Sequence, residues 1–220
     1  MVHSHPARYQ GAQGEEQTLI ENDGKQLRMV VRGVEFAGTD FDSLEPALDP
    51  ADLRLASFTL MGGSLCACHL EWVMPLPVIV GQELLEGQLQ AYLELGHPRP
   101  GNRGIDRETL RLCFSFGGAS YWSKGESLGS FEDGLRDIQQ ALPEGAYLKA
   151  CISCAFSDYS PAGNGLFGCL ACFRGNKAGY RQVKGKHDLF AIWDTMTEYV
   201  QETYLCPEFE HRRPGTGYRG

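Results

Sequence analysis

Four of the eight cysteines are spaced as the ligands of one metal ion would be. They form two pairs, with two residues inside each pair and fourteen between the pairs: Cys151 and Cys154, then Cys169 and Cys172. This spacing is typical of a four-thiolate zinc site. Because positions three apart in a straight strand point to opposite faces, the chain must turn at each pair. Turn-forming residues fill the stretch 157–165, so the pattern predicts a hairpin closed by a metal.

The chemistry of such a centre is structural. Four deprotonated sulfurs around Zn²⁺ form a closed tetrahedron that leaves no position for water, so the ion cannot act as a Lewis acid. Structural zinc contributes on the order of 10 kcal/mol to the folding of small zinc-binding peptides. That would stabilise a glycine-rich hairpin that buries little apolar surface. The alternatives are an iron–sulfur cluster or another metal, a redox-active dithiol, and cysteines that are simply packed in the core.

A fifth cysteine, Cys206, lies in the same C-terminal region and could take the place of one of the four. Short motifs surround these cysteines: Tyr147-Leu148-Lys149, Phe156-Ser157-Asp158-Tyr159-Ser160-Pro161, Phe167-Gly168, Cys172-Phe173-Arg174 and Gln201-Glu202-Thr203-Tyr204-Leu205-Cys206. The pattern resembles a family of uncharacterised bacterial proteins over roughly residues 108–220. The resemblance implies four metal ligands, at Cys151, Cys154, Cys172 and Cys206. It also implies that another residue often stands at the position of Cys169, and it implies no activity.

The residues ahead of the cysteine region predict antiparallel strands. Apolar and polar side chains alternate with a period of two in 65–74 and again in 85–95, which is typical of half-buried strands. Cys66 and Cys68 share the apolar face of the first run, so we interpret them as small buried hydrophobic residues. Cys113 is a lone thiol outside the main cluster.

We predict an α+β fold: an antiparallel β-rich N-terminal module, built as a sandwich or a curved sheet, with two C-terminal helices and the metal-stapled cysteine hairpin. Apolar residues at helical spacing predict a helix from Phe131 to about Leu142 and a second from Asp188 to about Gln201. The expected organisation is a disordered leader (1–17), a β-rich module (18–125), a zinc-ribbon-like cysteine-rich segment (126–206) and a flexible tail (207–220).

Charge is unevenly distributed along the chain. The formal net charge is −8, and residues 1–150 carry 12 basic and 21 acidic side chains, whereas residues 151–220 carry 8 and 7. The acidic surplus argues against a nucleic-acid-binding surface over the whole chain. A run with no acidic residue follows Cys172; its basic residues are Arg174, Lys177, Arg181, Lys184 and Lys186. This run is either a solvated surface or a site for an acidic partner, an anion or RNA.

The sequence favours a cytoplasmic protein. No stretch approaches the roughly 20 apolar residues that span a bilayer, and residues 1–17 lack the apolar core and cleavage site of an export signal. In a reducing cytosol the cysteines should be thiols or metal ligands rather than disulfides.

Our leading hypothesis is a non-enzymatic bacterial protein with structural zinc and a binding, accessory or immunity-like role, whose ligand the sequence does not specify. The first alternative is a metal- or thiol-dependent enzyme that uses the cysteine cluster. The second is RNA or acidic-partner binding through the basic run at 174–186. The ligands of the metal ion distinguish the structural-zinc hypothesis from the enzyme hypothesis. Four sulfur ligands are typical of a structural centre, whereas three protein ligands and one water are typical of a catalytic centre. The usual esterase and metalloprotease motifs, Gly-x-Ser-x-Gly and His-Glu-x-x-His, do not occur.

Overall fold

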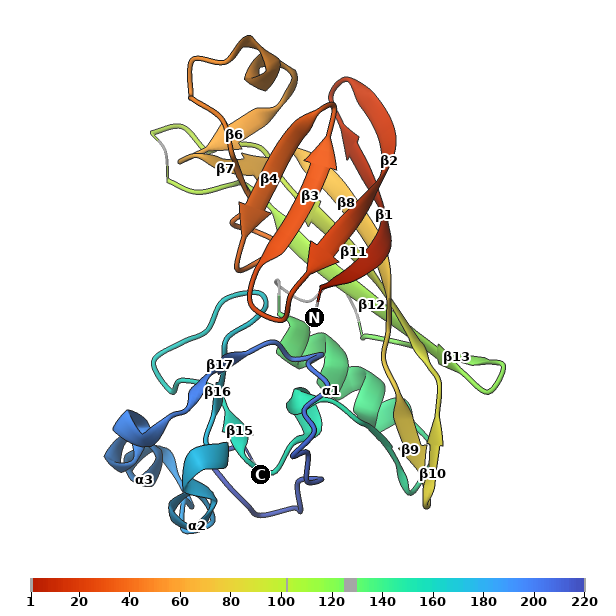
Figure 1. Cartoon of the computed structure of the whole chain (residues 1–220), viewed down its shortest axis with the longest axis vertical. Helices are drawn as coiled ribbons and strands as arrows, with labels where there is room; N and C mark the ends of the chain where they lie inside the picture. Colours follow the sequence, from red (N-terminus) through yellow and green to blue (C-terminus); the bar gives the residue numbers. More distant parts are fainter. Residues whose placement is uncertain (1, 102, 125–129, 220) are drawn as a thin grey trace.

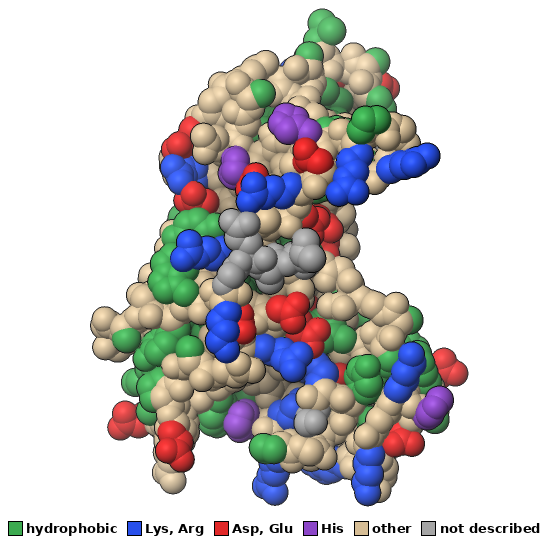
Figure 2. Space-filling view, turned by 180° about the vertical axis from the view of Figure 1, so that it is seen from behind, with side chains coloured by type: hydrophobic (Ala, Val, Ile, Leu, Met, Phe, Trp, Pro, Cys, Tyr) green, Lys and Arg blue, Asp and Glu red, His purple; other side chains and the backbone are tan. Residues whose placement is uncertain are grey.

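The computed structural model describes residues 2–101, 103–124 and 130–219. Figure 1 shows a curved antiparallel sheet in the upper part of the molecule and the cysteine-rich segment below it, with helix α1 (Phe131–Ala141) between them. Seen from behind, the outline narrows between the two parts (Figure 2). The predicted β-rich architecture with antiparallel sheets and few helices is confirmed.

The main sheet has nine strands in the order β13-β12-β11-β8-β1-β2-β3-β4-β5, and every neighbouring pair is antiparallel. In chain order they are β1 (His3–Gly11), β2 (Gly14–Asn22), β3 (Leu27–Val31), β4 (Val34–Gly38), β5 (Glu45–Pro46), β8 (Cys68–Pro75), β11 (Gln88–Leu95), β12 (Glu108–Phe116) and β13 (Ala119–Trp122). Strand β8 shows why these segments are strands: its apolar residues at every second position are buried and the residues between them are not. The same alternation in the sequence predicted this strand correctly.

The expected disordered leader at 1–17 is wrong. Strand β1 lies inside the main sheet, paired with β2 on one side and β8 on the other. Its alternate residues His5, Ala7 and Tyr9 are buried, while Pro6 between them is exposed and Arg8 is partly exposed. The period of two is therefore present, but these side chains are too polar or too small to reveal it as an apolar pattern.

Smaller elements complete the fold. One three-stranded sheet contains β10 (Glu83–Leu85), β9 (Val78–Val80) and β14 (Ala146–Leu148), and β6 (Thr59–Met61) pairs with β7 (Ser64–Cys66). A second three-stranded sheet contains β15 (Ser157–Asp158), β16 (Leu170–Cys172) and β17 (Glu198–Val200). Short 3₁₀ turns occupy Leu53–Ser57 (η1), Cys151–Ser153 (η2), Arg174–Asn176 (η3) and Trp193–Thr195 (η4).

Helix α1 confirms the helix predicted from Phe131. Its N-terminus is capped by Ser130, whose Oγ accepts a hydrogen bond from the Asp133 N–H. The helix packs against β12, β13 and β14. Gly134 allows the close approach to β12, because a Cβ at this position would lie 2.7 Å from Leu112 Cδ1.

The second predicted helix, from Asp188 to about Gln201, is wrong over most of its length. Two short helices, α2 (Lys177–Tyr180) and α3 (Lys186–Ala191), precede η4, and the chain then becomes strand β17. Threonine, tyrosine and valine are concentrated in 195–200, and β-branched and aromatic residues favour strands. Pairing with β16 therefore overrides the helical spacing of the apolar residues.

A shared core joins the predicted modules. One cluster of buried hydrophobic residues extends from Ala7 to Cys206. At its centre the rings of Phe41 and Trp72 are 4.0 Å apart between centroids, and Phe167 lies 5.1 Å from Phe41 and 4.7 Å from Phe131. The main sheet, α1 and the cysteine-rich segment thus pack against one another across the boundary expected at 125/126. Within the described residues, no helix is long and apolar enough to cross a membrane.

Candidate cysteine centre

The first cysteine pair lies on a tight turn, as the spacing predicts. Turn η2 begins at Cys151, and the Cys154 N–H donates a hydrogen bond to the Cys151 carbonyl (3.1 Å). The Ser157 hydroxyl donates to the same carbonyl (2.6 Å) and fixes the turn on β15. The turn brings Cys154 close enough to Cys151 for its sulfur to influence the pKa of the Cys151 thiol.

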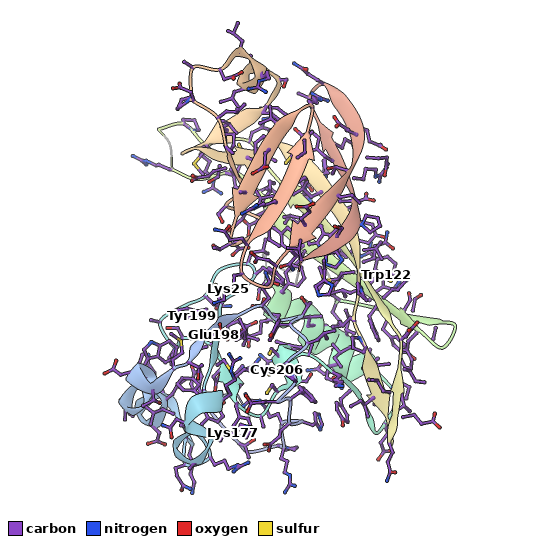
Figure 3. All side chains as sticks on the ribbon, viewed as in Figure 1. Lys25, Trp122, Lys177, Glu198, Tyr199 and Cys206 are labelled. Atoms are coloured by element: carbon purple, nitrogen blue, oxygen red, sulfur yellow. The ribbon has the colours of Figure 1, made fainter. Side chains whose placement is uncertain are left out.

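Backbone hydrogen bonds bring two further cysteines to this turn. Cys172 ends β16, where it is paired with Ser157 of β15. The Cys151 N–H donates to the Tyr204 carbonyl (3.0 Å), which places the segment that carries Cys206 beside η2. Three stretches far apart in the sequence therefore meet, and Figure 3 shows Cys206 within this part of the molecule.

All four thiols of this cluster are buried. Burial raises the pKa of Cys151, and the neighbouring sulfurs of Cys154, Cys206 and Cys172 raise it further. Burial also raises the pKa of Cys172, although Arg174 opposes this shift. The backbone contacts of η2 with β15 and with the segment at Tyr204, together with the pairing of β15 and β16, make Cys151, Cys154, Cys172 and Cys206 neighbours, in agreement with these shifts. We call them the four-cysteine cluster.

The side chains of the cluster are not closed around a common ion. Among the residues that the structure describes, no group of three or more His, Cys, Asp or Glu side chains has the geometry to hold a metal ion. Zinc–sulfur bonds are about 2.3 Å long, so metal binding requires the four thiols to rotate inward and lose their protons. The donor set nevertheless has the chemistry of a zinc site: four sulfurs, all buried.

Cys169 lies apart from this cluster. It is only partly buried, and its Sγ accepts a hydrogen bond from the Gly165 N–H (3.2 Å). Burial raises the pKa of Cys169, and the carboxylates of Asp40 and Glu202 raise it further. The two Cys-x2-Cys pairs therefore do not converge as a set of four, because Cys206 takes the place beside the other three thiols.

Two buried carboxylates hold the loop that carries Cys169, and sequence analysis did not single them out. The Asp40 carboxylate accepts hydrogen bonds from the N–H groups of Phe41 (2.7 Å) and Phe167 (3.0 Å). Glu202 accepts from the Gly168 N–H (2.7 Å) and the Tyr159 hydroxyl (3.0 Å). The spacing along the chain gives no signal for either group, because Asp40 and Phe167 are 127 positions apart.

The three remaining cysteines, Cys66, Cys68 and Cys113, lie outside the four-cysteine cluster, as predicted. Cys66 and Cys68 are both buried in the core cluster, which confirms their interpretation as small hydrophobic residues. Cys113 is also buried, on β12.

The basic run is partly neutralised by acidic residues of the same chain. Arg174 pairs with Glu198, Lys177 lies 3.1 Å from Glu208, and Arg181 lies 3.1 Å from Glu210, each measured between nitrogen and carboxylate oxygen. Figure 2 shows acidic and basic side chains mixed over the face opposite that of Figure 1. Less unpaired positive charge is therefore offered to a partner than the sequence of the run suggests.

The C-terminal segment, expected to be a flexible tail, makes specific contacts with the cysteine-rich segment. The buried Asp158 lies 3.3 Å from Arg219 Nε and accepts hydrogen bonds from the Tyr218 N–H (2.9 Å) and the Tyr180 hydroxyl (2.8 Å). Arg212 and Arg219 both donate to the Ser157 carbonyl. The tail thus covers β15 directly behind the first cysteine pair.

These features define a β-rich protein in which a nine-stranded sheet supports a buried four-cysteine cluster. The chain belongs to a family of unknown function, DUF6304, whose family model matches residues 3–157. The match includes the main sheet, α1 and the first cysteine pair, and it ends before Cys172 and Cys206. No curated protein and no solved structure matches the chain.

Proposed function

We propose that this protein is a non-enzymatic binding or accessory protein of the bacterial cytoplasm, in which a structural zinc ion holds the cysteine-rich segment together. The observation that carries the proposal is the convergence of four buried thiols from three separate stretches of the chain. Cys151, Cys154, Cys172 and Cys206 are the proposed ligands, and Cys169 is not one of them.

The cysteine-rich segment needs such a support. Its sheet contains one strand of two residues and two strands of three residues. Strands this short are marginally stable on their own. A metal ion bound by η2, β16 and the segment after β17 would fix the ends of this sheet, and its binding free energy would act as folding free energy.

The thiol environment favours a metal ligand over a nucleophile or a redox dithiol. Burial raises the pKa of Cys151 and of Cys172, so both thiols stay protonated and unreactive at neutral pH. A bound Zn²⁺ would offset the cost of deprotonating them, because its charge stabilises the thiolates. Four sulfurs would complete the coordination of zinc and leave no position open for a catalytic water.

The test is the metal content of protein purified without an affinity metal, combined with titration of its thiols before and after chelation. We expect about one zinc per chain and four additional reactive thiols once the zinc is removed. Iron or copper in place of zinc, or a disulfide between Cys151 and Cys154 that forms readily, would overturn the proposal and make a redox or metal-dependent activity the better explanation.

A further inference from the structure

A cleft of about 770 Å³ lies between the main sheet and the cysteine-rich segment. One wall is the turn after β2, with Gly24 and Lys25, and the opposite wall is the loop 163–168. Strand β17 and the residue after it, 198–201, form the floor. Figure 3 shows Lys25, Tyr199 and Glu198 beside one another at this place.

The cleft exposes the edge of β17 rather than one of its faces. Consecutive residues of a strand point to opposite faces, yet all four residues from Glu198 to Gln201 line the cleft. Strand β17 is the last strand of its sheet and pairs only with β16. Its outer edge therefore opens into the cleft.

The register of the sheet leaves the backbone of Tyr199 pointing outward. The Phe173 N–H donates to the Phe156 carbonyl, whereas the Cys172 carbonyl accepts from the Thr197 N–H on the other side, both at 2.8 Å. In an antiparallel sheet, successive residues of a central strand bond alternately to the two neighbouring strands. Since Cys172 is paired with Glu198, and Leu170 with Val200, the N–H and C=O of Tyr199 point away from β16.

A second polar group at the cleft lacks a partner. Gln201 is 97% buried, and its Oε1 accepts a hydrogen bond from Asn22 Nδ2 (2.8 Å). Its Nε2 has no hydrogen-bond partner in the described structure. The side chain lies between this cleft and a smaller cavity of about 360 Å³. A buried amide nitrogen without a partner is costly, so a shift of the Gln201 side chain toward the cleft, where a carbonyl oxygen of an occupant could accept its hydrogen bond, would be favourable.

We propose that the cleft binds an extended peptide segment of a partner protein, which adds as a fourth strand to the outer edge of β17. This inference rests on the proposed binding role and names its site. Main-chain hydrogen bonds give such strand addition its affinity, and Tyr199 offers one donor and one acceptor for them. Gly163 on the facing wall leaves space for a second backbone, because nothing lies within 4 Å of the position that a Cβ would take there.

The charged residues beside the cleft determine which kind of peptide segment it can bind. Lys25 Nζ lies 3.1 Å from Glu198 Oε2, and Arg174 pairs with the same carboxylate, so two cations share one anion and the edge keeps a net charge of +1. The cleft therefore suits a segment whose side chains are uncharged or acidic rather than basic. A second copy of the chain does not fit, because its own β17 lies at the floor of the same cleft and two recessed edges cannot meet.

Two substitutions distinguish the contribution of the Tyr199 backbone to peptide binding from that of its side chain. Tyr199→Pro removes the outward N–H but no hydrogen bond to β16, whereas Tyr199→Val keeps the N–H and loses the ring. Peptides selected from a random phage-displayed library on the wild-type protein would be synthesised and titrated by fluorescence anisotropy. We expect some to bind Tyr199→Pro at least ~10-fold more weakly than Tyr199→Val, the effect of about one lost hydrogen bond.

The result that overturns the inference is either a selection that enriches no peptide or peptides that bind the two variants equally. A wild-type dimer in sedimentation experiments that Tyr199→Pro abolishes would also overturn it, in favour of pairing between copies. Circular dichroism and metal content of both variants check that the fold is intact. If no peptide binds although the protein holds one zinc per chain, only this inference is contradicted. If the zinc is missing, the proposed structural centre is contradicted.

Discussion

A buried thiol has opposite roles with and without a cation beside it. Without a cation, the raised pKa values of Cys151 and Cys172 keep both sulfurs protonated, and they behave as small apolar groups. With zinc, the same burial excludes water and strengthens the attraction between the ion and the thiolates. The proposal therefore makes specific predictions about which cysteine can be replaced.

Replacing Cys206 by serine should remove the zinc and lower the free energy of unfolding by about 3 kcal/mol or more, because the loss of a structural metal is among the most destabilising changes. Replacing Cys169 by serine should leave the zinc in place and change stability by less than ~1 kcal/mol. A serine hydroxyl there can still accept the hydrogen bond from the Gly165 N–H. Urea denaturation and metal analysis of the two variants check this; the reverse pattern would assign the ligand to Cys169.

Asp40 makes stability depend on pH. Burial, followed by the neighbouring Asp42 carboxylate, raises the pKa of Asp40 from its ordinary value of 3.8 to about 7. Between these two values the folded protein keeps a proton that the unfolded chain has released. The stabilising effect of the protonated carboxyl is thus complete below pH 3.8 and is lost as the pH rises through 7.

We expect the free energy of unfolding to decrease between about pH 5 and 7, by up to ~1.4 kcal/mol per pH unit for this proton. Denaturation in urea at a series of pH values measures the slope. The variant Asp40→Asn, which is uncharged throughout, should show a shallower dependence. Equal slopes in the two proteins would mean that another group is responsible.

At the scale of elements, the sequence predicted those segments in which a single physical signal dominates. Strand β8 has a full apolar alternation, and α1 has both an apolar stripe and a serine cap, so both were predicted. Strand β17 was predicted as helix because Ile192, Trp193 and Met196 have helical spacing, although β-branched residues follow them. The partner strand β16, which decides the outcome, lies almost thirty residues away.

The centre was predictable only in part for a similar reason. The spacing of Cys151 and Cys154 required a turn, and the structure has one. Whether Cys169 or Cys206 joins the other three cysteines depends on which segments meet in the fold. The residues alone did not decide between the two, and only the resemblance to a family favoured Cys206. The carboxylates of Asp40 and Glu202 gave no signal, because their partners are backbone N–H groups of a distant loop.

Strand β1 offers a direct test at this scale. Tyr9 is buried and its ring lies 6.0 Å from that of Phe58, whereas the neighbouring Gln10 is exposed. Tyr9→Ala should lower the free energy of unfolding by roughly 3–5 kcal/mol, as for other large core aromatic residues. Gln10→Ala should change it by less than ~0.5 kcal/mol. Thermal denaturation of both variants measures these changes. If residues 1–17 were a disordered leader, neither substitution would change the stability.

For the molecule as a whole, the aromatic contacts between Phe41, Trp72, Phe131 and Phe167 join the sheet to the cysteine-rich segment. A second hydrophobic cluster lies beyond β16, and the two clusters share this strand: Leu170 and Cys172 belong to one, Ala171 to the other. The alternation of side chains along one strand therefore couples both cores, and separate folding of the two parts is not expected.

Unfolding should accordingly occur in one transition. Trp72 lies in the main core and Trp193 packs against the second cluster, so variants in which Trp122 and one of these two are replaced by phenylalanine report on the two parts separately. We expect their fluorescence midpoints in urea to coincide with each other and with the midpoint from circular dichroism. Two distinct midpoints would show that the parts around residue 125 unfold as independent domains.

The position of β1 has a consequence for the order in which the chain folds. Its pairing with β2 is local, but its pairing with β8 joins Ala7 to Trp72 and must wait for more than sixty intervening residues. Until then β1, β2, β3 and β4 can form a meander whose β1 edge is unpaired, and contacts so distant in sequence form slowly. An open strand edge invites pairing with other chains. Newly made protein is therefore most prone to aggregate in this interval, and faster closure by β8 would improve its recovery from refolding.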